Sequence, residues 1–163
     1  MLFLQYETGG IRMITYDLLQ ELDTIAIQKM ATKRAEKASE GQDLQSLRKM
    51  VEPILLQNRL KANTLGGYSV IDGSTEALDF LERGRVSLNR VSKILLVSDG
   101  LFLPHKLEGT EPWLKTASLA FSEGIQGLVT EVKRREEVDP ECKIYPRLKK
   151  LDDKTGILIE LSS

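Results

Sequence analysis

The sequence is poor in the residues that build redox and metal sites. Its 163 residues include one cysteine, one histidine and one tryptophan. The single cysteine, Cys142, forms no internal disulfide, and His105 is the only histidine, so a zinc site is disfavoured. A free thiol indicates a reducing compartment, and we expect a cytoplasmic protein. A serine-hydrolase triad is disfavoured as well, because no Gly-x-Ser-x-Gly sequence accompanies the histidine.

An excess of charge of one sign and long apolar runs are also absent. The chain has 23 basic and 24 acidic residues and a net charge of −1, which disfavours a nucleic-acid partner. The basic stretch 133–135 is followed at once by Glu136 and Glu137. This pattern is typical of a solvated helix end, with an acidic-partner or nucleic-acid patch as the alternative. No run is long and apolar enough to span a membrane, and the first residues lack a signal-peptide pattern, so we expect no membrane partner.

What is present is enough apolar material for a core. Hydrophobic residues make up 41% and charged residues 29% of the chain, which predicts one globular domain over residues 1–163. Two apolar runs, 2–6 and 11–15, flank Gly9-Gly10 and predict an opening β-hairpin. An αα-hairpin is expected over about 17–62. Asp17 caps its first helix, Gly41 ends that helix, and Asp43 caps the second.

Mixed strands and helices are expected after the αα-hairpin. The run 68–71 predicts a short strand. Four consecutive aliphatic residues at 94–97 predict a fully buried strand, and 156–161 predicts a closing strand. The fold class that follows is α+β, with a mostly antiparallel sheet layered with helices.

Two further helices are predicted in this part of the chain. Ser74 caps a short helix that runs through Leu81. Pro112 stands at the first turn of a longer one, where its missing N–H costs nothing. Gly124 and Gly127 weaken that longer helix, so we expect them to allow close packing.

The acidic residues at strand ends are the candidate ligands. Asp99 follows the predicted buried strand and precedes Gly100, whose lack of a side chain lets the backbone turn sharply. Asp152 and Asp153 immediately precede the last strand. Carboxylates that meet at strand ends suit a hard cation such as Mg²⁺ or Mn²⁺. Asp-Gly and Asp-Asp are also ordinary turn sequences, and the pattern alone favours that simpler interpretation.

Several short segments, taken in order, point to a known family. Together they resemble the bacterial relatives of the type-2C, metal-dependent protein Ser/Thr phosphatases. The segments are Arg59-x-x-x-Asn63 leading into 66–70, Lys-Ile-Leu-Leu-Val-Ser-Asp-Gly at 93–100, Glu136-x-x-Asp139-Pro140, Tyr-Pro-Arg at 145–147, and Lys-Leu-Asp-Asp-Lys-Thr at 150–155.

The resemblance implies half of an αββα sandwich. In this family two Mn²⁺ or Mg²⁺ ions lie between two sheets and activate a water that attacks a phosphorylated serine or threonine. By position, Asp99 and Asp152 look like ligands of one metal, and Asp153 like a nearby outer group or a replacement ligand. The likeness covers nearly the whole chain but only the C-terminal half of the family domain. The family's early acidic strand residue, its Asp-Gly-x-Gly-Gly loop and its phosphate-gripping arginine have no counterpart here, so the aspartate that bridges the two metals is missing.

The expected function follows from this incompleteness. We expect a phosphatase-like fragment that is not catalytic alone and has no catalytic residue of its own. It acts as a binding or oligomerising module, with at most a weak Mn²⁺ or Mg²⁺ site and no other cofactor. Half a sandwich leaves an apolar inner sheet face, which predicts a two-fold homodimer that covers it. The alternative is a metal-dependent phosphatase that is active only when a partner chain completes the two-metal site.

Overall fold

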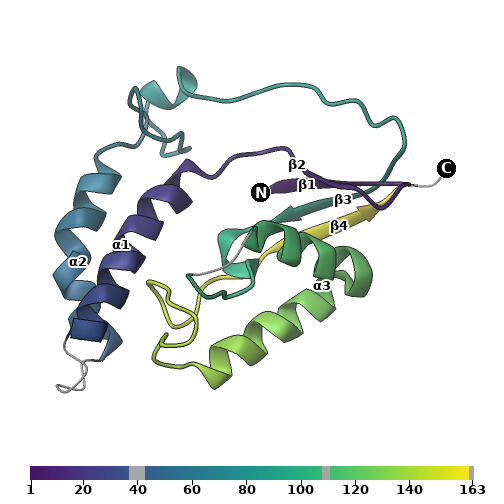
Figure 1. Cartoon of the computed structure of the whole chain (residues 1–163). Helices are drawn as coiled ribbons and strands as arrows, with labels where there is room; N and C mark the ends of the chain where they lie inside the picture. Colours follow the sequence, from purple (N-terminus) through teal and green to yellow (C-terminus); the bar gives the residue numbers. More distant parts are fainter. Residues whose placement is uncertain (37–42, 108–110, 162–163) are drawn as a thin grey trace. The chain divides into compact units, whose positions relative to one another are not determined.

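A computed structural model describes residues 1–36, 43–107 and 111–161, and Gly41 lies outside these residues. The chain divides into two compact units (Figure 1). The sheet unit comprises Met1–Tyr16 and Leu88–Ser163, and the helix-hairpin unit comprises Asp17–Ser87. No helix within the described ranges combines the length and the apolar character that a membrane span requires.

The sheet unit contains four strands, and every pair of neighbours is antiparallel. They are β1 (Leu2–Tyr6), β2 (Ile11–Met13), β3 (Val91–Val97) and β4 (Gly156–Glu160), in the order β2-β1-β3-β4. The opening hairpin is confirmed, since β1 and β2 pair across a turn in which Gly9 has a φ of 83°. With its helices, the sheet confirms the α+β class.

One face of the sheet packs against α3 (Pro112–Val138) (Figure 1). Its helical start at Pro112 is as predicted. Phe3 of β1 and Leu95 of β3 are direct partners across the ladder, so their side chains share this face. Both are fully buried, together with Leu128 and Val132 of α3. This cluster is the core that fixes the position of β3.

The second sheet face is apolar but only partly buried. The register places Leu2, Leu4, Ile94, Leu96, Ile157 and Ile159 on it. Leu4 is buried, whereas Leu96, Ile159 and Ile157 keep exposed fractions of 39%, 41% and 56%. The prediction of a fully buried strand at 94–97 was therefore wrong. Alternate residues of β3 face opposite sides, and α3 covers only one of them.

A break within α3 explains one of its glycines. Gly124 has φ 75° and ψ 178°, a conformation available almost only to glycine. A Cβ at Gly124 would meet nothing within 4 Å, so close packing is the wrong reason for this residue. At Gly127 a Cβ would lie 2.5 Å from the Cβ of Glu123, so space is tight there, but this neighbour belongs to α3 itself. Beside the break, Lys93 Nζ donates to the carbonyl oxygen of Phe121 at 3.1 Å.

The helix-hairpin unit contains α1 (Leu18–Glu36) and α2 (Leu44–Arg59), which pack against each other. Both predicted caps are confirmed. Asp17 Oδ1 accepts the N–H of Gln20 at 3.0 Å, and Asp43 Oδ1 accepts that of Ser46 at 2.7 Å. These short side chains satisfy donors that a helix start leaves free.

The strand predicted at 68–71 does not form. Tyr68 makes only an isolated bridge with Ala62, and the side chain of Asn63 bonds both the N–H and the C=O of Val70. These bonds satisfy backbone groups that a sheet would otherwise pair. The helix predicted from Ser74 to Leu81 is shorter than expected, a 3₁₀ turn over Glu76–Leu78.

Candidate functional site

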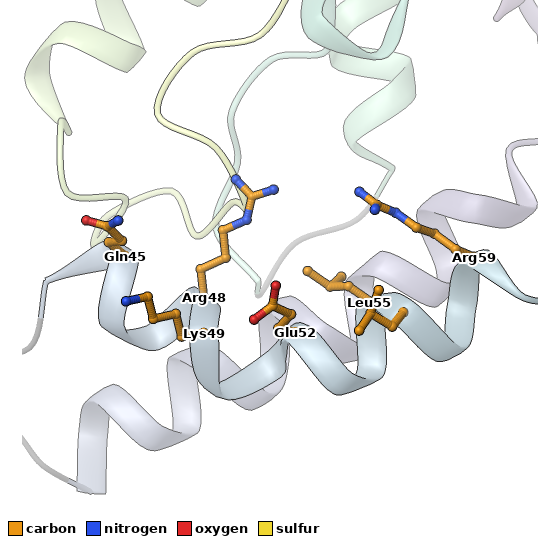
Figure 2. A pocket seen from close by; sticks show the side chains of 7 residues that line it. Gln45, Arg48, Lys49, Glu52, Leu55 and Arg59 are labelled. Carbon is orange, nitrogen blue, oxygen red and sulfur yellow. The ribbon is translucent and has the colours of Figure 1, made fainter.

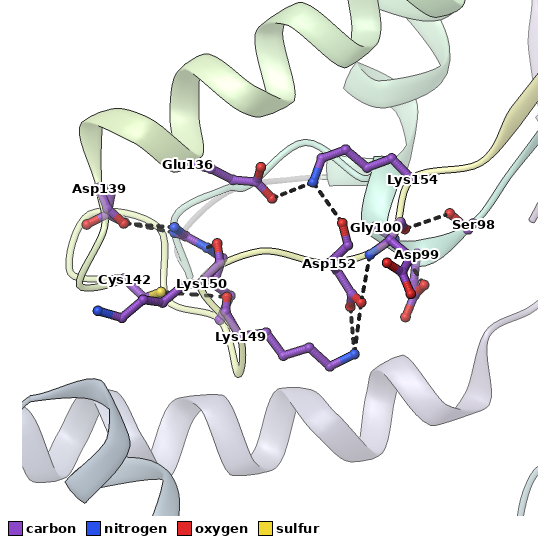
Figure 3. Close-up of polar contacts among 12 residues, drawn as sticks. Ser98, Asp99, Gly100, Glu136, Asp139, Cys142, Lys149, Lys150, Asp152 and Lys154 are labelled. Atoms are coloured by element: carbon purple, nitrogen blue, oxygen red, sulfur yellow. Dashed lines mark hydrogen bonds and ion pairs between the residues drawn. The ribbon is translucent and has the colours of Figure 1, made fainter.

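The candidate site lies where the ladder between β3 and β4 ends. Val97 pairs with Gly156 in the last rung. Ser98 continues the contact, because its N–H donates to the carbonyl oxygen of Thr155 at 2.9 Å and its Oγ accepts the Thr155 N–H at 3.0 Å. The Ser98 hydroxyl also donates to the carbonyl oxygen of Asp153 at 3.3 Å. The segments that carry Asp99 and Asp153 therefore lie side by side (Figure 3).

Gly100 allows these two segments to touch. A Cβ on this residue would lie 2.0 Å from the carbonyl oxygen of Asp153 and 3.2 Å from the Cβ of Asp152. No side chain fits there unless the backbone of one segment moves. Gly100 also belongs to a short 3₁₀ turn, Asp99–Leu101, and its N–H donates to Asp99 Oδ1 at 2.9 Å.

The three predicted ligands differ in what already surrounds them. Asp99 and Asp153 are exposed. Both carboxylate oxygens of Asp152 accept from Lys149 Nζ, at 3.0 and 2.8 Å, and one also accepts the N–H of Asp153 at 3.0 Å. Burial opposes the ionisation of Asp152, but these donors outweigh it and lower its pKa. Across residues 1–36, 43–107 and 111–161, no three His, Cys, Asp or Glu side chains form a ready metal site.

In the sequence Glu136 stands out only as part of the Glu136-x-x-Asp139-Pro140 motif, yet in the structure it holds the turn before β4 in place. Its Oε1 accepts from Lys154 Nζ at 2.9 Å, and the same ammonium donates to the carbonyl oxygen of Asp152 at 3.0 Å (Figure 3). Glu136 is buried and Lys154 is partly buried, with exposed fractions of 6% and 13%. The pair ties the Asp152 segment to α3. Sequence spacing gives no signal for it, since 18 residues separate the partners.

Asp139 organises the loop that follows α3. Its carboxylate accepts the backbone N–H groups of Lys143, Ile144 and Tyr145 at 2.7, 3.1 and 2.8 Å, and Arg147 adds an ion pair at 3.0 Å. Arg147 also donates to the Asp139 carbonyl oxygen at 2.7 Å. Burial opposes the ionisation of Asp139, but the N–H groups and Arg147 outweigh it and lower its pKa. This clamp fixes the loop that leads to Lys149.

The remaining candidates have structural partners or lie exposed. Arg134 and Arg135 both pair with Glu131 at 2.7 Å, and these pairs lower the pKa of the Glu131 carboxyl to about 2. The pairing fits the interpretation of the basic stretch as a solvated helix end. Cys142 is buried, with Sγ 3.7 Å from the carbonyl oxygen of Lys149. His105 is exposed on a loop, and its Nδ1 lies 3.3 Å from the Leu103 carbonyl oxygen.

Comparisons with known proteins leave the family open. No protein-family model, curated protein or solved structure matches this chain. The resemblance to type-2C phosphatases stays a prediction that rests on the short segments given above.

Replacing Asp139 by asparagine is expected to lower the free energy of unfolding by about 3 kcal/mol at neutral pH, because it leaves Arg147 without its buried counter-ion. The folded-state pKa of Asp139 lies below its ordinary value of 3.8. The stabilisation is therefore fully present above that value and is lost as pH falls through the folded-state pKa. Urea unfolding followed by Trp113 fluorescence measures the difference.

Glu137→Gln, the control, removes an exposed charge nearby and should leave stability unchanged. Equal stabilities of the wild type and Asp139→Asn at neutral pH would contradict this role.

Proposed function

We propose that this chain is a non-catalytic half of a type-2C phosphatase-like scaffold that works as a binding module. It associates through the second sheet face and holds a divalent cation weakly at the end of β3 and β4. The observation that carries the proposal is the contact between the Asp99 turn and the Asp152-Asp153 turn, made through Gly100. A single cysteine, which cannot form a disulfide within the chain, fits a cytoplasmic location.

The chemistry of the donors suits a single hard cation, although among the described residues the three carboxylates are not already gathered into a site. Asp99, Asp152 and Asp153 supply carboxylate oxygens, the ligands that Mg²⁺ and Mn²⁺ prefer. Asp99 and Asp153 are exposed, and Asp152 is held by an exposed lysine that a cation can displace. When bound, such an ion would supply Lewis acidity to a phosphoryl oxygen or a water.

Catalysis by this chain alone is not expected. A two-metal phosphatase site needs more carboxylates than these three, including one that bridges the metals. The Ser98 hydroxyl is already engaged with backbone groups of the neighbouring turn, which supports a structural role for it. In this proposal the three aspartates hold a cation and carry out no chemistry themselves.

The second sheet face supports self-association. Leu96, Ile157 and Ile159 together form an exposed aliphatic surface on neighbouring strands. Burying one such side chain completely contributes about 1.5–3 kcal/mol. A two-fold dimer uses the same patch on both copies, so each residue counts twice.

A second candidate function rests on the same turns. Because Asp99 and Asp153 are exposed at one end of the sheet, another chain that brings further carboxylates there would complete a two-metal phosphatase site. Hydrolysis of p-nitrophenyl phosphate with Mn²⁺ by the chain alone would contradict the non-catalytic proposal. Activity that appears only with a second protein would favour this candidate.

Mn²⁺ titration by isothermal calorimetry tests the cation site. The wild type is expected to bind one ion weakly. Asp99→Asn and Asp152→Asn should each weaken binding about tenfold, because affinity follows the number of charged ligands. Lys149→Met should strengthen it by up to about fivefold, since an exposed ion pair is worth at most about 1 kcal/mol.

Two matched controls accompany this titration. Asp79→Asn removes an exposed carboxylate from the helix-hairpin unit. Lys150→Met removes the same charge as Lys149→Met, but Lys150 pairs with Glu141 at 2.6 Å. Neither should change Mn²⁺ binding. No binding by the wild type, or equal binding by Asp99→Asn, contradicts the site.

Sedimentation velocity at tens of micromolar tests the association. The wild type is expected to sediment as a dimer, and Ile157→Lys as a folded monomer, because a lysine on the second sheet face brings two charges together across a two-fold interface. Ile71→Lys is the matched control, since Ile71 is 89% exposed in the helix-hairpin unit. A monomeric wild type contradicts the proposal.

A further inference from the structure

The outer face of α2 is a basic groove with an apolar floor. Leu44, Leu47 and Val51 are the buried side of this helix. The flank of the helix next to this buried side lines a hollow of about 310 Å³ (Figure 2). Its residues recur at the three- and four-residue spacing of one helix face. Those that carry the argument are Arg48, Lys49, Glu52, Leu55, Leu56 and Arg59. We call this surface the α2 groove.

The cations of the α2 groove are not neutralised. Within the described part of the chain, Arg48, Lys49 and Arg59 form no hydrogen bond or ion pair through their side chains. Glu52 is the single acid among them, and it too has no such partner, although it lies one helical turn from Arg48 and Lys49. The groove therefore carries an excess of two positive charges.

The arrangement of charge and apolar surface limits what fits. Arg48 and Arg59 extend on either side of Leu55 (Figure 2), and along a helix they stand about 16 Å apart at 1.5 Å per residue. Leu56 is 52% exposed beside them. Two leucines framed by cations match a segment with apolar residues in its middle and carboxylates around them. No aromatic side chain lines the groove, so stacking of nucleic-acid bases has no platform.

We propose that the α2 groove docks an acidic amphipathic helix of a partner protein. Leucine-type side chains of the partner cover Leu55 and Leu56, and its carboxylates pair with Arg48, Lys49 and Arg59. This surface belongs to the helix-hairpin unit and does not depend on the cation site or on the second sheet face.

Fluorescence anisotropy with a labelled synthetic peptide tests this proposal. The probe is a 14-residue helical peptide of glutamate and leucine with the leucines on one face, and its control has the same composition in scrambled order. The full chain is expected to bind the amphipathic peptide saturably and in preference to the scrambled one. Arg48→Glu combined with Arg59→Glu should weaken binding at least about tenfold, because two attractive contacts become repulsive. Leu56→Ser should weaken it by a smaller factor.

The control variant makes the same change of charge elsewhere. Arg83→Glu combined with Arg85→Glu alters two exposed arginines of the same unit that lie outside the groove. It should bind the peptide like the wild type, and circular dichroism checks that all variants remain folded. Equal weakening by both double variants would show diffuse electrostatic attraction and overturn the proposal. So would equal binding of the scrambled peptide, the absence of binding, or preferential binding of RNA or of phosphatidylserine vesicles.

Discussion

The antiparallel ladder between β3 and β4 determines where the candidate site lies. It joins two turns whose contacting residues, Ser98 and Asp153, are 55 positions apart in the chain. Closing so long a loop costs entropy, and the apolar core between the sheet and α3 offsets that cost. Once the last rung between Val97 and Gly156 is fixed, the Ser98 bonds and the contact at Gly100 follow from local geometry. The acids at the two strand ends are neighbours for this reason.

Local signals were sufficient for much of the fold. The glycines of the first turn predict the hairpin because they accept a positive φ, as Gly9 does. Asp17 and Asp43 mark both helix starts because each side chain bonds a donor within three residues. Pro112 opens α3 because its fixed φ suits a first turn. The prediction that the two acidic turns meet came from the family resemblance, since the sequence pattern alone favoured ordinary turns at both places.

The wrong predictions concern contacts between different segments, which the sequence of a single segment does not specify. Val70 stands in a strand-like sequence, but Asn63 satisfies its backbone groups and no partner strand exists for it in the described chain. Leu96 is as aliphatic as Leu95, and only the position of α3 decides which of them is covered. The engagement of Asp152 by Lys149 depends on side-chain geometry, which the turn sequence does not specify. Each of these features depends on contacts that exist only once its unit has folded.

The contact between the two acidic turns is tested most directly by the free energy of unfolding of Gly100→Ala, followed through the fluorescence of Trp113 in the sheet unit. The added methyl group would lie 2.0 Å from the Asp153 carbonyl oxygen, so we expect a loss of about 2–3 kcal/mol. Gly10→Ala is the control in the same unit, because its Cβ would meet nothing closer than the Thr8 hydroxyl at 3.7 Å. If Gly100→Ala is as stable as Gly10→Ala, the two turns do not touch and the proposed site is not formed.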